Sequence, residues 1–294
     1  MTSVRARLDE IRTLITTHAD RSAPLAVEGL RLYLERAPSP PVALLFRPTL
    51  YLVFQGTKQL LLDDRTVSYG AGDLVTSSID LPATVQVTGA TDDAPYLAVE
   101  LAVDRDLLAG LAAEMPPLSS PPDETVTVHP LPEAVVDPVL RLLRLLDEPA
   151  AAGVLARGVQ REIFYRVLAG PDGGALLHLV RTDSVLARIG HLTRWMHEHL
   201  DTPVDVARLA ARAAMSAPTF HRHFKAATGT SPIEYHKQLR LHEARRLIAI
   251  DDDSVSRIAA AVGYASPSRF SRDYKRVFGT SPALDTVRFD PRVT

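Results

Sequence analysis

Two similar ten-residue stretches near the end of the chain decide how it is expected to fold. The first reads Ser216-Ala-Pro-Thr-Phe-His-Arg-His-Phe-Lys225 and the second reads Ser266-Pro-Ser-Arg-Phe-Ser-Arg-Asp-Tyr-Lys275. Each opens with Ser, a residue favoured at the N-cap of a helix. Each then carries Phe, Arg, an aromatic residue and Lys at the same spacing, and both run on to Gly-Thr-Ser-Pro. The repeat predicts two helices of the same kind.

A shorter helical pattern precedes each stretch. Leu209-Ala210 matches Ile258-Ala259 at an offset of 49 residues, whereas the two stretches match at an offset of 50. The extra residue falls at Tyr264-Ala265, where an insertion belongs in a turn. Two short helices joined by a tight turn, with a small residue for close approach, favour a helix-turn-helix unit. The sequence therefore predicts two such units.

A helical rod is expected between the two units. Ser231-Pro-Ile-Glu234 is a capping box, and apolar residues recur from there to about Ile250. At 1.5 Å per residue, roughly 17 residues give a rod of about 26 Å. Successive major grooves on one face of DNA lie about 34 Å apart. Helices on either side of the rod are therefore expected to reach both grooves, with some bending of the DNA.

Two more helices are expected before the first unit is complete. Residues 184–200 show apolar side chains at helical spacing and predict an amphipathic helix. Thr202-Pro-Val-Asp205 has Thr at a cap position, Pro at the first helical position and an acid three residues after the cap. It predicts the start of a helix that runs to Ala214, and Met215 then marks the turn.

Charge is divided unevenly along the chain. The whole sequence has a formal net charge of −2. From Ser184 to the end it carries 17 Lys+Arg against 11 Asp+Glu, a net of +6, so the part before it has a net of −8. A basic last third suits a polyanionic partner.

The residues of the second unit carry a family resemblance. The motif is Ile258-Ala-Ala-Ala-Val-Gly-Tyr-Ala-Ser-Pro-Ser-Arg-Phe-Ser-Arg-Asp-Tyr-Lys-Arg-Val-Phe-Gly-Thr-Ser-Pro282, and with it residues 184–288 closely resemble the DNA-binding domain of the AraC/XylS family. The resemblance implies a one-component transcriptional regulator that senses a signal through a dimerising N-terminal domain and binds double-stranded promoter DNA. RNA polymerase and a small-molecule effector, which the sequence does not identify, are further expected partners. Two departures from the family pattern are the acid Asp273 on the second repeated helix and the small Ala265 in the turn.

The spacing of the aromatic residues predicts which side chains meet DNA. Phe220 and Phe224 are four residues apart and should face the core, as should Phe270 and Tyr274. Arg222 and its counterpart on the second helix are the strongest expected base readers, because a guanidinium grips guanine O6 and N7 together. The full set of expected base readers is Pro218, Thr219, His221, Arg222, Ser268, Arg269, Ser271 and Arg272. Expected phosphate contacts are Lys225 and Lys275, and also the helix starts capped by Ser231 and Ser281.

The first half of the chain has a different texture. Short apolar runs recur between residues 30 and 101, separated by turn signals such as Gly70-Ala-Gly72 and Asp92-Asp93. Evenly spaced short strands favour a small antiparallel barrel or sandwich. Tyr69-Gly-Ala-Gly-Asp-Leu-Val75 resembles a cupin barrel, and the run from Tyr51 to Val87 resembles the N-terminal domain of one branch of the AraC/XylS family. Tyr51, Phe54 and Tyr96 are candidates to face the inside of the barrel and are equally well read as core.

Helices are expected to follow the strands. Residues 4–19, 104–115, 133–146 and 154–168 show helical spacing, and 125–129 is strand-like. The pair 133–168 has more than one apolar face, so one face covers the barrel and another pairs with a second subunit, or the pair is buried within one chain. The fold class expected is α+β with two domains: a cupin-like regulatory and dimerisation barrel at 1–170, a linker at 171–183, and an all-α double helix-turn-helix domain at 184–294.

Several classes of function are disfavoured by composition. The chain has no Cys, which excludes disulfides and thiolate metal sites. It has no apolar run of about 18 residues, so no membrane span is expected and the cytoplasm is the simplest location. No His lies between His18 and His129, so the strands lack the imidazoles of a metal-binding cupin; Asp73, Asp80 and Glu100 read as turn or surface acids. We expect no metal, no cofactor and no enzymatic activity. A catalytic barrel fused to DNA-binding helices and a general DNA-coating protein are the alternative hypotheses.

Overall fold

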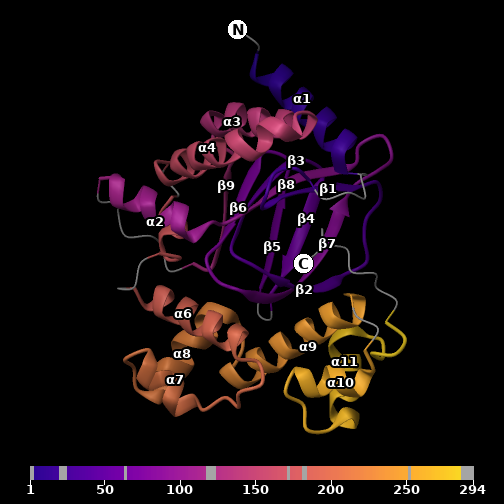
Figure 1. Ribbon diagram of the computed structural model, residues 1–294, viewed down its shortest axis with the longest axis vertical. Helices are drawn as coiled ribbons and strands as arrows, with labels where there is room; N and C mark the ends of the chain where they lie inside the picture. Colours follow the sequence, from indigo (N-terminus) through magenta and orange to yellow (C-terminus); the bar gives the residue numbers. More distant parts are fainter. Residues whose placement is uncertain are drawn as a thin grey trace.

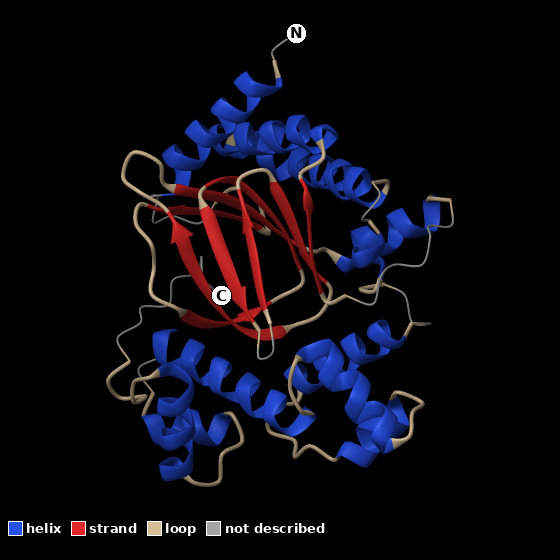
Figure 2. Cartoon of the chain, turned by 180° about the vertical axis from the view of Figure 1, so that it is seen from behind, coloured by secondary structure: helices blue, strands red, loops and turns tan. Residues whose placement is uncertain are grey.

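The computed structural model describes residues 3–19, 25–62, 65–116, 124–170, 173–180, 184–250 and 253–285. Strands and covering helices make up the first part of the chain, and helices alone make up the last part (Figure 1). This is the α+β, two-part arrangement that the sequence predicts. Figure 2 shows the strands gathered between a layer of helices on one side and the C-terminal helices on the other.

Antiparallel strands form two sheets in the first part. One sheet has the order β1-β8-β3-β6-β9 and the other has the order β2-β7-β4-β5. Strands occupy most of residues 30–102, where the sequence predicts evenly spaced short strands. The strands are β1 (Leu30–Glu35), β2 (Val42–Phe46), β3 (Thr49–Gln55), β4 (Thr57–Leu61), β5 (Thr66–Gly70), β6 (Asp73–Ser77), β7 (Leu81–Gly89), β8 (Tyr96–Ala102) and β9 (Val126–Pro130).

The described strands do not close into a barrel, so the barrel form of the prediction is wrong and two facing sheets replace it. Strands β3 and β4 are consecutive but lie in different sheets. Between them Gly56 has a φ of 79°, and a Cβ at this position would lie 2.5 Å from the carbonyl oxygen of Gly89 and 2.8 Å from Cα of Tyr96. Only Gly fits this crowded turn, which sends the chain from one sheet to the other instead of continuing the ladder.

Strand β3 is buried on both faces, which explains its uninterrupted apolar sequence. Leu50, Leu52 and Phe54 pack with the covering helices. Tyr51 and Val53 point the other way, into the space between the two sheets. In contrast, β7 alternates buried and half-buried residues, as a strand with one buried face should.

Helices cover the five-stranded sheet on its outer face (Figure 1). Helix α3 is apolar on its inner side, and six of its seven buried residues join those of α1 and α4 in one core. Burial of α3 within the chain is thus the alternative that the structure supports for this helix. The bounds are α1 (Val4–Ala19), α2 (Arg105–Glu114), α3 (Glu133–Arg144), the short 3-10 helix η1 (Leu145–Asp147), α4 (Pro149–Leu168) and α5 (Gly174–Leu177).

The last part of the chain holds two small helical units joined by one long helix. The bounds are α6 (Val185–Glu198), α7 (Val206–Arg212), α8 (Ala217–Thr228), α9 (Pro232–Ile250), α10 (Val255–Ala261) and α11 (Pro267–Phe278). One core joins α6, α7, α8 and the first half of α9, and a separate core joins the second half of α9 with α10 and α11. The rod has 19 residues, which makes it about 28 Å long.

Both units close their turn in the same way. The amide of Met215 donates to the carbonyl of Ala210 at 3.0 Å, and the amide of Tyr264 donates to the carbonyl of Ala259 at 2.8 Å. The residue before each of these amides is left-handed: Ala214 has a φ of 54° and Gly263 a φ of 80°. The equivalence at an offset of 49 residues therefore continues through the turn, and the extra residue of the second unit follows it, as predicted.

Several expected boundaries are corrected by the structure. The helix predicted to start at Thr202 begins at Val206, because the Asp205 carboxylate accepts from the amides of Ala207 at 2.9 Å and Arg208 at 3.1 Å. A carboxylate that satisfies two amides is a stronger cap than a Thr hydroxyl. Helix α4 starts at Pro149 rather than Val154, with Pro at its first position. After Ser281 the described chain makes a turn rather than the expected helix.

The segment expected as a linker is structured where it is described. Residues 171–172 and 181–183 lie outside the described residues. Between them, α5 ends at Leu177, and Leu176, Leu177 and Leu179 are buried in the core that covers the sheet. The connection is therefore packed against the first part of the chain.

The two parts of the chain are in direct contact through α9 (Figures 1 and 2). The Tyr235 hydroxyl donates to the carbonyl of Asp80 at 2.7 Å. Farther along the same helix, the Arg245 guanidinium donates to the carbonyl of Ala43, in β2, at 3.1 Å. Leu45 of β2 packs into the core of the first helical unit, and Leu186 of α6 packs among the residues between the sheets.

We predict opposite effects for matched substitutions in the two turns. Ala214→Gly should raise the free energy of unfolding by about 0.5 kcal/mol, because relief of a left-handed Ala exceeds the added entropy of Gly in the unfolded chain. Gly263→Ala should lower it by about 1–2 kcal/mol, because the new Cβ would also lie 3.0 Å from Cα of Asp201. Thermal and urea unfolding measure both changes. Equal effects of the same sign would contradict this account of the turns.

Candidate functional site

The repeated helices present equivalent outer faces. Phe220, Phe224, Phe270 and Tyr274 are fully buried, as the spacing predicts. On the outer face of α8, Pro218, His221 and Arg222 are exposed and Thr219 is half-buried. On α11, Ser268, Arg269 and Arg272 are exposed and Ser271 is half-buried. All eight expected base readers therefore lie at or near the surface of the two second helices.

Ser residues fix the start of each repeated helix. The Ser216 hydroxyl accepts from the amide of Thr219 at 3.4 Å, and the Ser266 hydroxyl accepts from the amide of Arg269, also at 3.4 Å. Each helix ends at a left-handed Gly, Gly229 or Gly279. Shared caps at both ends give the two helices the same length and bring equivalent side chains to equivalent positions.

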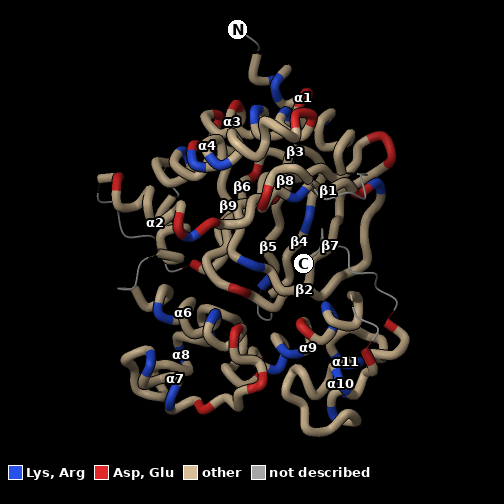
Figure 3. Tube along the Cα trace, viewed as in Figure 1, with Lys and Arg blue, Asp and Glu red and all other residues tan. Residues whose placement is uncertain are grey.

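The two central arginines are free to bind a ligand. Within the described residues, Arg222 and Arg272 make no hydrogen bond or ion pair. Lys225 and Lys275 are exposed at the end of each helix. Lys and Arg positions on α7, α8, α10 and α11 are marked in Figure 3. A guanidinium held on a rigid helix without an internal partner can donate two parallel hydrogen bonds to a base edge or a phosphate.

The acid on the second repeated helix is engaged within the protein. The Asp273 carboxylate accepts from the Tyr264 hydroxyl at 3.3 Å and lies 3.6 Å from the Arg276 guanidinium. Burial, followed by the neighbouring Asp273 charge, raises the pKa of Tyr264 above its ordinary range, so the phenol keeps its proton and donates. Asp273, a departure from the family pattern, thus links the turn of the second unit to helix α11 through its hydrogen bond with Tyr264.

The two Ser residues expected at phosphate-binding helix starts differ from each other. The Ser231 hydroxyl accepts from the amide of Glu234 at 3.3 Å and caps α9 as predicted. Ser281 precedes a turn in the described chain, so it caps no helix there. The equivalence of the two units ends at this point because only the first is followed by the rod.

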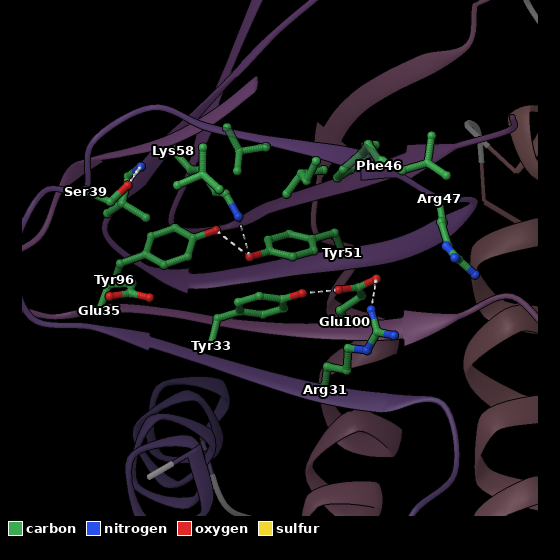
Figure 4. Close-up of a pocket in the computed structure, with 15 residues that line it drawn as sticks. Arg31, Tyr33, Glu35, Ser39, Phe46, Arg47, Tyr51, Lys58, Tyr96 and Glu100 are labelled. Atoms are coloured by element: carbon green, nitrogen blue, oxygen red, sulfur yellow. Dashed lines mark hydrogen bonds and ion pairs between the residues drawn. The ribbon is translucent and has the colours of Figure 1, made fainter. Parts of the chain in front are cut away.

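A pocket lies between the two sheets (Figure 4). Its volume is about 90 Å³. Tyr51 and Tyr96, two of the expected inward candidates, line it, whereas Phe54 packs with the covering helices on the other side of β3. The lining residues are Arg31, Tyr33, Glu35, Ser39, Val42, Leu44, Leu45, Phe46, Arg47, Tyr51, Lys58, Val85, Val87, Tyr96 and Glu100.

Polar side chains in this pocket form a connected group. The Tyr33 hydroxyl donates to Glu100, whose other oxygen accepts from the Thr49 hydroxyl at 3.1 Å. The Lys58 ammonium and the Tyr96 hydroxyl both donate to the Tyr51 hydroxyl, at 3.3 Å and 3.0 Å. Figure 4 shows Lys58 pointing toward these rings.

Sequence reasoning missed Lys58 and misread Glu100. Lys58 is buried in β4 and Glu100 faces the pocket from β8, where the sequence suggested a surface acid. Asp73 is a turn acid as expected, because its carboxylate accepts from the amide of Gly70 at 2.7 Å. The one available signal was the position of Lys58 in its strand. Lys58 and Leu60 are two residues apart in β4, so their side chains lie on the same face of the sheet, and that face is buried.

The described residues contain no group of three or more His, Cys, Asp or Glu side chains arranged to hold a metal ion. In the same residues, no helix combines the length and apolar character that crossing a membrane requires.

Comparison with known proteins agrees with both halves of this architecture. A family model described as the AraC-type transcriptional regulator N-terminus matches residues 26–175, and a helix-turn-helix domain model matches residues 209–284. The HTH-type transcriptional activator RhaS of Escherichia fergusonii is 36% identical over 145 residues, which cover 49% of this chain and 51% of that protein. RhaS of Salmonella agona is 32% identical over 158 residues, covering 51% and 54%. The chain thus spans about half the length of the curated relatives it matches.

Solved structures show the same fold along most of the chain. A crystal structure of a single-residue variant of apo ToxT from Vibrio cholerae superposes with a TM-score of 0.60 and covers 86% of this chain and 94% of that one, at 12% sequence identity. At this identity the likeness concerns the fold alone. The N-terminal family model covers residues 26–175, about half of the chain, and the helical units follow in the expected order. The chain belongs to the family of AraC-type transcriptional regulators.

Proposed function

We propose that this protein is a sequence-specific regulator of transcription that binds double-stranded promoter DNA through its two helix-turn-helix units. The observation that carries the proposal is the pair of equivalent, exposed arginines, Arg222 and Arg272, on helices α8 and α11. Because they make no internal hydrogen bond or ion pair in the described part of the chain, they remain available to bases.

The proposed division of roles follows the position of each side chain. The eight residues on the outer faces of α8 and α11 read base edges, with Arg222 and Arg272 at their centre. Lys225, Lys275 and the capped start of α9 at Ser231 hold phosphates and position the protein without specifying sequence. The Ser281 hydroxyl is proposed to donate to a phosphate directly, because no helix begins there in the described chain.

The length of α9 supports binding to two successive major grooves. A rod of about 28 Å is shorter than the groove repeat of about 34 Å. The protein therefore has to bend the DNA toward itself or tilt its helices for both units to engage. The rod gives the proposed complex a fixed spacing, because each unit packs its own core against one half of α9.

We further propose that a small-molecule effector acts from the pocket between the sheets. The support is adjacency: β2 lines the pocket and also meets the helical part of the chain, through Leu45 and the carbonyl of Ala43. A ToxT structure contains a bound unsaturated fatty acid, so a protein with this fold accommodates a small molecule. A ligand that displaces β2 would alter the contact that holds α9.

A homodimer is the proposed assembly, with α4 as its contact. On α4, Val154 is 80% exposed, Leu155 is 53% exposed and Tyr165 is 48% exposed. Val154 and Tyr165 are eleven residues apart, three turns of helix, and so share a face. Exposed apolar side chains on one face favour pairing with a second copy. As a promoter-bound regulator, the protein is proposed to work in the cytoplasm, with RNA polymerase as its partner.

The base-reader assignment predicts a loss of discrimination. Arg222→Ala and Arg272→Ala should each reduce the preference for the selected site over random DNA by about 1–3 kcal/mol. Lys225→Ala is the matched control: it should weaken binding to both DNAs equally and lower the salt slope by about one. Competition binding on a site selected by the wild-type protein measures these effects.

If both Arg variants discriminate as the wild type does, neither arginine reads bases. If the wild-type protein itself shows a specificity ratio near one, it coats DNA rather than reading it, and the proposed function fails.

The α4 contact predicts a change of assembly. Val154→Glu combined with Tyr165→Glu should convert a dimer into a monomer, because two buried carboxylates per copy would lack partners. Ile233→Glu, which changes an apolar residue of α9 that is 63% exposed, should leave the dimer intact. Light scattering with size-exclusion chromatography reports the mass. A wild-type monomer at all concentrations, or a double variant that still dimerises, would rule out α4 as the contact.

A further inference from the structure

The pocket between the sheets contains hydrogen-bond donors that lack acceptors. The Tyr51 hydroxyl oxygen accepts from Lys58 at 3.3 Å and from Tyr96 at 3.0 Å. A phenol oxygen accepts at most two hydrogen bonds and donates one, so the proton of Tyr51 must point elsewhere. Within the described residues it has no acceptor among the side chains that line the pocket.

Lys58 has spare donors of its own. Its ammonium carries three N–H groups, and one of them is used by Tyr51. The ammonium otherwise faces aromatic rings, at 5.1 Å from the centre of Tyr33, 5.0 Å from Tyr51 and 5.8 Å from Tyr96. Ring faces stabilise a cation without satisfying its N–H groups.

A further buried hydroxyl lies beside Lys58 on the neighbouring strand, outside the set of residues that line the pocket. Tyr69 of β5 is the direct cross-strand partner of Lys58, and its ring meets Tyr51 edge-on with centroids 6.0 Å apart. Tyr69 is only 3% exposed, and its hydroxyl has no partner among the described residues. Buried hydroxyls without partners are rare in folded proteins because each costs the desolvation of its polar group.

The carboxylates near this cluster are used or out of reach. Glu100 accepts from Tyr33 and Thr49 and lies 3.8 Å from Arg31. No carboxylate lies within 4.0 Å of the Lys58 ammonium in the part of the chain that is described. Burial therefore dominates and lowers the pKa of Lys58 to about 8, although Glu100 and Glu35 act in the opposite direction.

We propose that Lys58 and Tyr51, the donor pair, bind the carboxylate of a short-chain carboxylic acid, and that this anion is the effector of the regulator. A carboxylate offers about four acceptor sites and no donor, which matches the spare N–H groups of Lys58 and the spare O–H of Tyr51. A sugar would bring no negative charge to offset that of Lys58, and an amine would add a second positive charge beside it. The role as effector rests on the function proposed above, whereas the binding site does not.

The size and walls of the pocket restrict the rest of the ligand. Its volume is about 90 Å³, compared with about 150 Å³ for an apolar cavity that holds benzene. This space suits an acid with a few carbons and excludes a long acyl chain. Leu44, Val85 and Val87 supply an apolar wall for the alkyl part. Leu44 lies in β2, next to Ala43, whose carbonyl accepts from Arg245 of α9. A ligand in the pocket would therefore contact the strand on which α9 docks.

Butyrate, titrated into the full-length protein by calorimetry, tests the proposal. Butyrate should bind with a Kd below about 1 mM, and butyramide, which has the same shape without the charge, should bind at least about ten-fold more weakly. Oleate should not compete with butyrate. Lys58→Met should reduce butyrate affinity by about ten- to a hundred-fold, and Tyr51→Phe by about five-fold. Lys225→Met, the same change on α8, is the matched control and should leave butyrate affinity unchanged.

Proton uptake provides a second readout. An anion beside Lys58 raises the pKa of its ammonium, so at pH 8 binding should take up about half a proton per site, and almost none at pH 6. Calorimetry in buffers of different ionisation enthalpy measures this number. The other ionisable groups facing Lys58 are Tyr33 and Glu35 of β1, Tyr51 of β3, Tyr69 of β5, and Tyr96 and Glu100 of β8. Burial raises the pKa of each of these tyrosines well above pH 8, so they stay protonated; the uptake should be absent in Lys58→Met.

Three results would overturn the proposal: no binding of butyrate at about 10 mM, roughly ten times the expected Kd; equal binding of butyramide; or full affinity in Lys58→Met. The Met variant should fold, because replacing a buried cation by an apolar side chain of similar length is neutral or stabilising; Lys58→Arg serves as a second variant that keeps the charge. DNA binding by Lys58→Met without ligand separates the two proposals. If the variant binds DNA as the wild type does but has lost butyrate binding, the ligand site is independent of the regulator's action on DNA. If the wild type binds butyrate but its DNA affinity does not change, the effector role fails.

Discussion

The docking of one helix on one strand holds the architecture together. Helix α9 joins the two helix-turn-helix units, and it is also the helix that contacts β2 and the carbonyl of Asp80. Tyr235 and Arg245, ten residues apart on α9, anchor it to the first part of the chain at two points. A rigid element fixed at two points transmits displacement rather than absorbing it. Any movement of β2 must therefore either move the rod or break one of these hydrogen bonds.

The same strand arrangement explains how a small protein holds a polar pocket without losing its core. Strand β3 is apolar on its helix-facing side, where Leu50 and Leu52 join α1 and α3, and it presents Tyr51 to the space between the sheets. The stability of the first part thus comes mainly from the helix-covered face, where apolar side chains of the sheet pack with those of α1, α3 and α4 in one large core. The inner face can then accommodate a buried Lys and four tyrosines, groups that cost free energy to bury unless a partner satisfies them.

Much of the fold could be predicted from local pattern. The caps at Ser216 and Ser266 are where the sequence places them, and the inward aromatic pairs follow from a spacing of four residues. Two local errors are instructive. Thr202 was expected to cap a helix, but Asp205 is the N-cap, because its carboxylate accepts hydrogen bonds from two amides at once. The strand pattern was compatible with a barrel or a sandwich, and the expected barrel is wrong: at Gly56, close approach of Gly89 and Tyr96 turns the chain into a second sheet. Both outcomes depend on contacts that a linear pattern does not contain.

Local sequence is sufficient for the two repeated units, their spacing and the outward position of Arg222 and Arg272, because a helix with four-residue aromatic spacing leaves only one face for the remaining side chains. The character of the pocket, in contrast, depends on long-range packing. Lys58, Tyr51 and Tyr96 come from three different strands, and none of them carries a local signal beyond its parity in the strand. The docking of α9 on β2 also depends on tertiary structure, because that contact joins Arg245 to a carbonyl 202 residues away, at Ala43. Helices and turns form through contacts between residues that are close in sequence. A pocket forms where segments distant in sequence pack together, and their register is fixed by the packing of the whole domain.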